Sequence, residues 1–325
     1  MSTSQLSTTT SLYPDRSTRL MVLGIFQFLL GCLCGLLAVM MVAFSLLAPI
    51  ANVSPTQAMY RQTMIPGLVF YLPVAVALIW LGIGLVRAHR WAWTLTVVLS
   101  WMWLIMGVVS LVMFEFFIEM PPEVPTGVRI FLGAVIATMY ILVPGVFLVL
   151  CHHESVRATC QRRDPKIRWT DLCPMPVLAL SIMLAVSVVS MSSVLAYGCV
   201  LPVFGFLISG AAGAVAIILI ALVLSYLALG TYQLQMSAWW GTLLLGITGT
   251  LNMVVTCLRT DLIEMYQKTG MTTDQLEMMR KTGFVQSMSQ WGPWMALVGG
   301  AGWLGFMLYV RRYFVRTGEG TTAAS

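Results

Sequence analysis

Long apolar stretches alternate with short polar segments along almost the whole chain. A helix needs about 20 apolar residues to cross the hydrocarbon core of a bilayer. Eight stretches meet this requirement, and none carries Asp, Glu, Lys or Arg near its middle. They are residues 20–47, 67–86, 92–114, 128–150, 177–197, 204–229, 238–258 and 293–310. The pattern predicts an all-α integral membrane protein with eight transmembrane helices.

The composition supports the same fold class. Of the 325 residues, 59% are hydrophobic and only 9% are charged, whereas soluble domains carry about 25% charged residues. A soluble fold of this size has too much surface to hide so many apolar side chains. The first stretch is too long and too uniformly apolar for a signal peptide, so we expect it to remain as a span.

The basic residues are distributed unequally over the expected connections between spans. If the N-terminus is cytoplasmic, the inner segments hold twelve Lys and Arg residues and the outer segments hold six. Positive charge concentrates on the cytoplasmic side of membrane proteins. We therefore expect a protein of the cytoplasmic (inner) membrane with both termini cytoplasmic. The net charge of +6 then reflects topology, and we expect no nucleic-acid partner.

Two short motifs recur at a separation of 146 residues. The recurring positions are Leu78, Leu81, Gly84 and Ala92-Trp93, which return as Leu224, Leu227, Gly230 and Ala238-Trp239. Each copy joins an even-numbered span to the next one, which predicts two parallel repeats of four helices. The alternative is that apolar helices resemble one another through composition alone.

This repeat gives a simple organisation for the chain. We expect a cytoplasmic N-terminal segment at 1–18, a first four-span half at 19–151, a basic linker at 152–176, a second half at 177–312 and a tail at 313–325. The first segment is rich in Ser and Thr. Such a segment buries too little apolar surface to offset its ordering entropy, so we expect it to be mobile.

The two longer outer loops are expected to carry short amphipathic helices on the membrane surface. In loop 49–66, Ser54 before Pro55 is typical of a helix start. In loop 259–291, Asp274 followed by Glu277 indicates another start, and Gly283 could end that helix. Near the same face lie Cys199 and Cys257, but the sequence does not decide whether they pair.

Small residues inside the spans predict where helices approach one another closely. Lipid gives helices no hydrophobic reason to associate, so close contact depends on small side chains. The residues that we expect at helix contacts are Gly31, Gly35, Gly210, Gly213 and Gly302.

The segment 151–174 between the two halves concentrates histidine, cysteine and basic residues. His152, His153 and Cys160 are zinc-ligand types, but the segment contains no CxxC or HxxxH spacing. Adjacent histidines on a helix point about 100° apart. We therefore favour a helix end followed by a basic linker, and we expect no metal or other cofactor.

The same linker is suited to anionic lipid headgroups. Each basic residue at the inner surface contributes about 1 kcal/mol of attraction to an acidic leaflet. The residues expected to contact headgroups are Arg157, Arg162, Arg163, Lys166 and Arg168.

The sequence lacks the common enzyme motifs. It contains no GxSxG, GxxxxGK[ST] or HExxH, and no paired carboxylates within a span. We therefore expect a non-enzymatic protein, a membrane-embedded subunit or scaffold that packs against partner helices, a second copy of itself, or lipid. One alternative is a transporter or channel for a neutral or weakly polar solute, with Ser192 and Asn252 as candidate contacts. Another is a metal-handling membrane protein.

Overall fold

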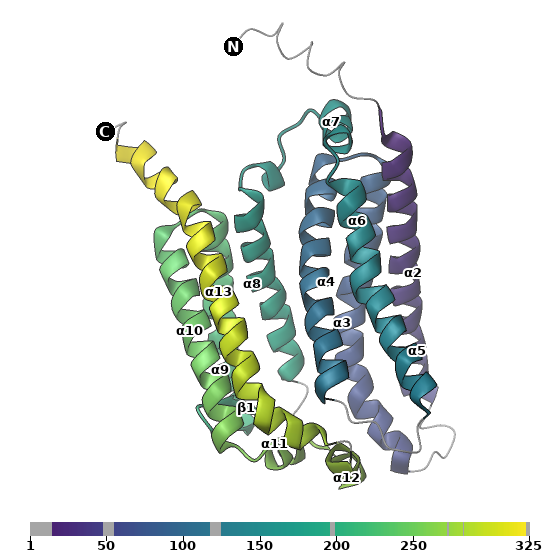
Figure 1. Cartoon of the computed structure of the whole chain (residues 1–325), viewed down its shortest axis with the longest axis vertical. Coiled ribbons are helices and arrows are strands. Elements are labelled where there is room, and N and C mark those ends of the chain that lie inside the picture. The colour runs from purple at the N-terminus through teal and green to yellow at the C-terminus, as the bar shows by residue number, and fades with distance from the viewer. Residues whose placement is uncertain are drawn as a thin grey trace, which may run out of the picture. The chain divides into compact units, whose positions relative to one another are not determined.

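The computed structural model describes residues 15–47, 55–117, 125–195, 199–271, 273–281 and 283–322. Helices form most of this part of the chain (Figure 1). In chain order they include α2 (Ser17–Leu47), α3 (Pro55–Val86), α4 (Arg90–Phe117), α5 (Thr126–Ala137), α6 (Val143–Cys151), α7 (Glu154–Arg163), α8 (Met175–Val194), α9 (Gly210–Tyr232), α10 (Met236–Arg259), α11 (Leu262–Lys268), α12 (Thr273–Lys281) and α13 (Phe284–Thr322).

Six helical segments are long and apolar enough to cross a membrane, which confirms a multi-pass, helical membrane protein. They are Ser17–Ala43, Arg90–Glu115, Thr126–Cys151, Gly210–Tyr232, Met236–Arg259 and Phe284–Val315. Two shorter apolar segments, Tyr71–Val86 and Met175–Met191, lie in α3 and α8. The number of eight spans stays a prediction.

Contacts divide the chain into two compact units, which we describe separately. The first unit comprises Met1–Gly107 and Ala137–Leu172, and the second comprises Val108–Ile136 and Cys173–Ser325. The boundary passes through α4 and near the middle of the α5–α6 span. The predicted halves at 19–151 and 177–312, with their linker, stay a prediction.

In the first unit, α2 and α3 pack together through glycines. A Cβ at Gly24 would lie 2.7 Å from the Gly82 carbonyl oxygen, and a Cβ at Gly82 would lie 2.7 Å from the Phe28 amide nitrogen. A Cβ at Gly31 would lie 2.8 Å from Ile79. Any larger side chain at these positions would therefore force the two backbones apart. Small residues at helix contacts are the usual basis of such packing in lipid.

The α5–α6 span contains a wide turn. The π-helix η1 (Thr138–Leu142) separates α5 from α6. Pro144 has no amide hydrogen and cannot donate to the Tyr140 carbonyl, so the helix widens locally. A Cβ at Gly107 of α4 would overlap that carbonyl oxygen, so a glycine is needed where the two helices meet.

The α3–α4 and α9–α10 hairpins share one turn geometry. Ala88 in the first turn and Leu234 in the second have φ angles of 53° and 59°, in the left-handed region that non-glycine residues rarely adopt. In each turn the next residue donates its amide hydrogen to a carbonyl five residues earlier, which ends the helix as a Schellman motif. These bonds run from His89 to Gly84 and from Gln235 to Gly230, both at 2.9 Å.

The core of the second unit forms where α8, α9, α10 and α13 meet around Trp239. This side chain is fully buried, and its indole N–H donates to the Met307 carbonyl oxygen at 3.0 Å. The Arg311 guanidinium lies 5.6 Å from the Trp239 ring centroid, within the range of a cation–π contact. One large aromatic residue thus joins α10 to α13.

The predicted span 204–229 begins too early. Before α9 the structure has a hairpin of two antiparallel strands, β1 (Leu201–Val203) and β2 (Phe206–Ile208). Phe204 and Gly205 form its turn, with φ angles of 48° and 91°, as a two-residue hairpin requires. The hairpin was missed because its residues are as apolar as the helix that follows.

Short helices are present in one of the two longer predicted loops, whereas the other loop has no separate helix in its described residues. In loop 259–291, α11 and α12 are present, and Gly283 follows α12 with a φ of 65°. In loop 49–66 the helix that begins at Pro55 is not separate, because α3 continues from there to Val86. Residues 48–54 lie outside the described part of the chain.

The structure describes little of the predicted N-terminal segment and most of the predicted C-terminal tail. In segment 1–18, residues 1–14 lie outside the described residues, and α2 begins at Ser17. Helix α13 begins at Phe284, before the predicted span 293–310, and continues through the predicted tail as far as Thr322. No proline lies between Phe314 and Thr322 to stop it.

Candidate functional site

The predicted linker folds against the end of the first unit where α2 begins (Figure 1). Helix α7 buries one face, formed by Ser155, Val156, Thr159 and Cys160. The backbone N–H of Arg16, next to the start of α2, donates to Thr159 Oγ1 at 3.1 Å. The linker is therefore an ordered part of this end of the unit.

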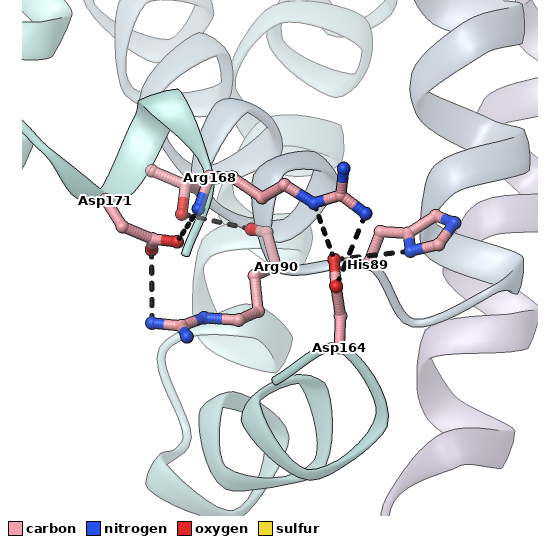
Figure 2. A network of polar contacts seen from close by, with 6 residues as sticks. His89, Arg90, Asp164, Arg168 and Asp171 are labelled. Atoms are coloured by element: carbon pink, nitrogen blue, oxygen red, sulfur yellow. Dashed lines mark hydrogen bonds and ion pairs between the residues drawn. The ribbon is translucent and has the colours of Figure 1, made fainter. Parts of the chain in front are cut away.

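The carboxylate of Asp164, directly after α7, is the centre of a polar network. Figure 2 shows it between the Arg168 guanidinium and the His89 ring. Arg168 donates to it through Nε at 3.3 Å and Nη2 at 3.4 Å. His89 Nδ1 lies 3.4 Å from Asp164 Oδ2, an ion-pair distance without hydrogen-bond geometry. Because His89 belongs to the α3–α4 turn, this contact holds the linker to that hairpin.

A second acid, Asp171, lies seven positions after Asp164 and also contacts the start of α4. Asp171 ends the short 3-10 helix η2 (Trp169–Asp171) and lies 3.3 Å from Arg90 Nη2 through its Oδ1 atom. Its Oδ2 atom accepts a hydrogen bond from the Arg168 backbone N–H at 3.0 Å. The α3–α4 turn is thus bound by two carboxylates from the linker (Figure 2).

The charge state of Asp164 follows from its neighbours. Burial alone would raise the pKa of this carboxyl, which is only 5% exposed. The Arg168 hydrogen bond and charge, the His89 ring and the Arg90 backbone together outweigh burial, so the pKa is lowered. The ionised, fully paired carboxylate is suited to fix structure rather than to exchange protons.

The three residues predicted as metal candidates lie in different environments. His152 and His153 are exposed where α6 ends and α7 begins, and His153 Nδ1 lies 2.9 Å from Ser155 Oγ. Cys160 is buried, and burial raises the pKa of its thiol to about 12, so it is protonated at neutral pH. Within the described residues, no three His, Cys, Asp or Glu side chains gather closely enough to hold a metal.

The five basic residues predicted to contact lipid fall into two groups. Arg163 pairs with Asp15 at 3.5 Å, and Arg168 pairs with Asp164. The other three are exposed, and they are Arg157, Arg162 and Lys166.

The glycines predicted at helix contacts are also placed differently from one another. Gly31 lies in the close α2–α3 contact, Gly35 lies opposite Ala75 at an ordinary distance, and a Cβ at Gly213 would overlap the Cys199 carbonyl oxygen. A Cβ at Gly210 or Gly302 would enter open space.

The structure describes the side chains of one of the two candidate solute contacts and of both cysteines whose pairing was left open. Asn252 binds the β1–β2 hairpin, because its amide N–H donates to the Pro202 carbonyl at 3.1 Å and its oxygen accepts from the Phe204 amide. The side chain of Ser192 lies outside the described residues. Cys199 and Cys257 are both free thiols.

A shallow groove of about 310 Å³ runs along the α2–α3 pair. Its lining consists of Ile25, Phe28, Ile83, Val86 and Arg87. Four of these five residues are apolar, so the groove suits hydrocarbon better than a polar substrate.

The network residues His89, Arg90, Asp164 and Asp171 were not predicted as a site. The sequence does contain a signal, because Asp164 and Asp171 are acids that stand among the basic residues of the linker. Their partners lie some eighty residues away in the chain, and a single sequence does not give that pairing.

Comparison with known proteins yields no family model, no curated protein and no solved structure that matches the chain. The function is therefore inferred from its own residues. Two features bear on it, the linker bound to the α3–α4 turn of the first unit and the exposed surface of α13 described next.

Proposed function

We propose that the chain is a non-enzymatic subunit or scaffold of a membrane complex, which packs against partner helices and lipid. The observation that carries this proposal is an uncovered small-residue face on α13. Ala301, Gly302 and Gly305 are exposed there, and Val298 on the same face is 74% exposed. These positions recur at the spacing of one helix face.

The opposite side of α13 is used inside the chain. A Cβ at Gly300 would lie 2.6 Å from Thr250 of α10, and Trp303 of α13 lies directly against Gly246. A Cβ at Gly302 or Gly305 would instead meet open space. Small residues separated by three others let a second helix approach closely in lipid. The free face therefore suits a helix of another subunit.

We also propose that the subunit consists of two related, parallel four-span halves. The two Schellman turns support this, because Ala88 and Leu234 are 146 residues apart. The tryptophan contacts support it too. Trp93 Nε1 donates to the Cys151 carbonyl at 3.0 Å, as Trp239 does to Met307. In each copy, a tryptophan in the first turn of one span bonds to the backbone of a later span.

The glycines at the two turns give the same correspondence. A Cβ at Gly84 would lie 2.5 Å from the Ala92 Cβ, and one at Gly230 would lie 2.7 Å from the Ala238 Cβ. Both pairs hold the two helices of a hairpin close together. The excess of basic residues in the linker and other inner segments further supports a cytoplasmic membrane with both termini inside.

The test is the mass of the intact assembly. We expect native mass spectrometry of protein released gently from its own membrane to give a complex heavier than 35.8 kDa. A double variant, Gly302→Leu with Gly305→Leu, should dissociate this complex by filling the helix contact. The control is Gly249→Leu, a single change of the same kind on α10 where a Cβ also meets open space.

Three results would count against the proposal. A bare monomer from the native membrane would remove the partner, and solute flux by the monomer reconstituted alone would favour a transporter. A complex that survives in the double variant as well as in the control would show that the α13 face is not the contact.

A further inference from the structure

The linker exposes three large apolar side chains beside its basic residues. Ile167 is 74% exposed, Leu172 is 67% exposed and Trp169 is 45% exposed. All three lie within eight residues, between Pro165 and Leu172. Apolar groups gathered in this way usually mark a surface that contacts a partner or a membrane.

The backbone places these three side chains on one side of the segment. Arg168 is extended, with φ and ψ of −103° and 163°, so its neighbours Ile167 and Trp169 point the same way. The next residues form the 3-10 helix η2, which Leu172 ends with its N–H bonded to the Trp169 carbonyl at 3.3 Å. Side chains three positions apart in this geometry eclipse, so Leu172 projects from the same side as Trp169. Arg168, on the opposite side, reaches Asp164.

The polar network fixes the depth of this segment. Asp164 precedes it and contacts His89, and Asp171 near its end contacts Arg90. His89 ends the turn between α3 and α4, and Arg90 is the first residue of α4, at the point where one apolar helix ends and the next begins. The segment is therefore held at the level where these helices leave the hydrocarbon core.

The charge beside the apolar side chains is positive. Lys166 is exposed and precedes Ile167, and Arg157 is exposed on α7. Neither of these two residues makes an ion pair with any residue that the structure describes. Tryptophan is enriched at the headgroup level of membranes, and lysine and arginine there attract anionic lipids.

We infer that residues 165–172, together with Arg157 of α7, form an interfacial anchor, in which Ile167, Trp169 and Leu172 insert into the leaflet and Lys166 and Arg157 bind anionic phospholipid headgroups. The anchor holds the inner end of the first unit at the membrane surface. It does not depend on a partner subunit.

The first test identifies what covers the apolar side chains. Benzoylphenylalanine at Leu172, in the full chain in nanodiscs, should on illumination give adducts with the mass of a phospholipid. The same probe at Leu244, which is 62% exposed in the α10 span, is the positive control. The inference is wrong if the probe at Leu172 joins another segment of the chain or another protein, or reacts with nothing while the probe at Leu244 gives lipid adducts.

The second test concerns the headgroups. In nanodiscs of equal parts phosphatidylcholine and phosphatidylglycerol, native mass spectrometry should show retained phosphatidylglycerol. The double variant Arg157→Gln with Lys166→Gln should weaken its binding about 5-fold for each charge removed. The control, Lys268→Gln with Lys281→Gln, removes the same charge from α11 and α12. Equal retention in both variants would overturn the headgroup role, and it would leave the adducts at Leu172 to decide apolar insertion separately.

Discussion

Asp164→Asn keeps the shape of the buried side chain and removes its charge. The variant weakens the Arg168 hydrogen bonds and the contact with His89, and it keeps one oxygen to accept the Arg90 backbone N–H. We expect the linker to loosen from the α3–α4 turn while the transmembrane helices stay folded.

The expected loss of stability in Asp164→Asn depends on how deeply Asp164 and Arg168 are each buried. Breaking a buried ion pair costs about 3–5 kcal/mol. The side chain of Arg168 is 38% exposed, however, so water can solvate its charge once Asp164 is neutral. A loss of about 2 kcal/mol, the range of hydrogen bonds to charged groups, is therefore expected. It corresponds to about 30-fold more frequent opening of the linker.

Hydrogen exchange in nanodiscs measures this opening directly. Amides around η2 should exchange about 30-fold faster in Asp164→Asn, and amides in the middle of α3 should not change. The control is Glu264→Gln, which breaks an exposed i,i+4 pair with Lys268 and should cost less than about 0.5 kcal/mol. Unchanged exchange around η2 would refute the view that Asp164 holds the linker.

The same pair predicts a pH dependence. The folded pKa of Asp164 is lowered, so its ionised form stabilises the linker above the ordinary aspartate pKa of about 3.9. This stabilisation is lost as the pH falls through the lowered value. The wild-type chain should therefore exchange more slowly than Asp164→Asn at neutral pH and lose that advantage in strongly acidic buffer.

Three further predictions concern the helix contacts and the hairpin. Trp93→Phe and Trp239→Phe should each reduce stability by about 1 kcal/mol in thermal unfolding, because each loses one hydrogen bond, which is partly buried at Trp93 and buried at Trp239; a large effect at only one position would contradict the equivalence of the halves. Gly82→Ala should destabilise by about 1–3 kcal/mol through overpacking, whereas Gly145→Ala, with open space around its Cβ, should be neutral or stabilising by up to about 1 kcal/mol; a neutral Gly82→Ala would exclude the close α2–α3 contact. Asn252→Ala should speed amide exchange in the β1–β2 hairpin, and altered solute flux without faster exchange would point to a solute contact instead.

The positions of most membrane helices could be predicted because apolar length is a local property of the sequence. The stretch 92–114 corresponds to α4, and 238–258 corresponds to α10, with ends that agree within a few residues. Helix α12 was also predictable, since its start and its end are marked by residues in the loop itself. In each case the signal and the structure involve the same residues.

The remaining features depend on residues far apart in the chain. Phe204–Ile208 is apolar enough to continue the following span, and its hairpin is held instead by Asn252 on another helix. For the linker, the sequence indicates only possible metal ligands and an excess of positive charge. Its ordering depends on Asp164 and Asp171, whose partners lie in the α3–α4 turn, so neither local charge nor periodicity indicates it.

On the proposed repeat, the two turns share a backbone and differ in what they bind. His89 and Arg90 of the first turn correspond to Gln235 and Met236 of the second. Neither glutamine nor methionine can neutralise a carboxylate, and Gln235 bonds locally to Gln233 at 2.7 Å. The common turn therefore serves hairpin formation in both halves, because it needs only backbone bonds. The added charges bind the linker, so the difference in sequence accounts for a bound segment at the first turn and not at the second.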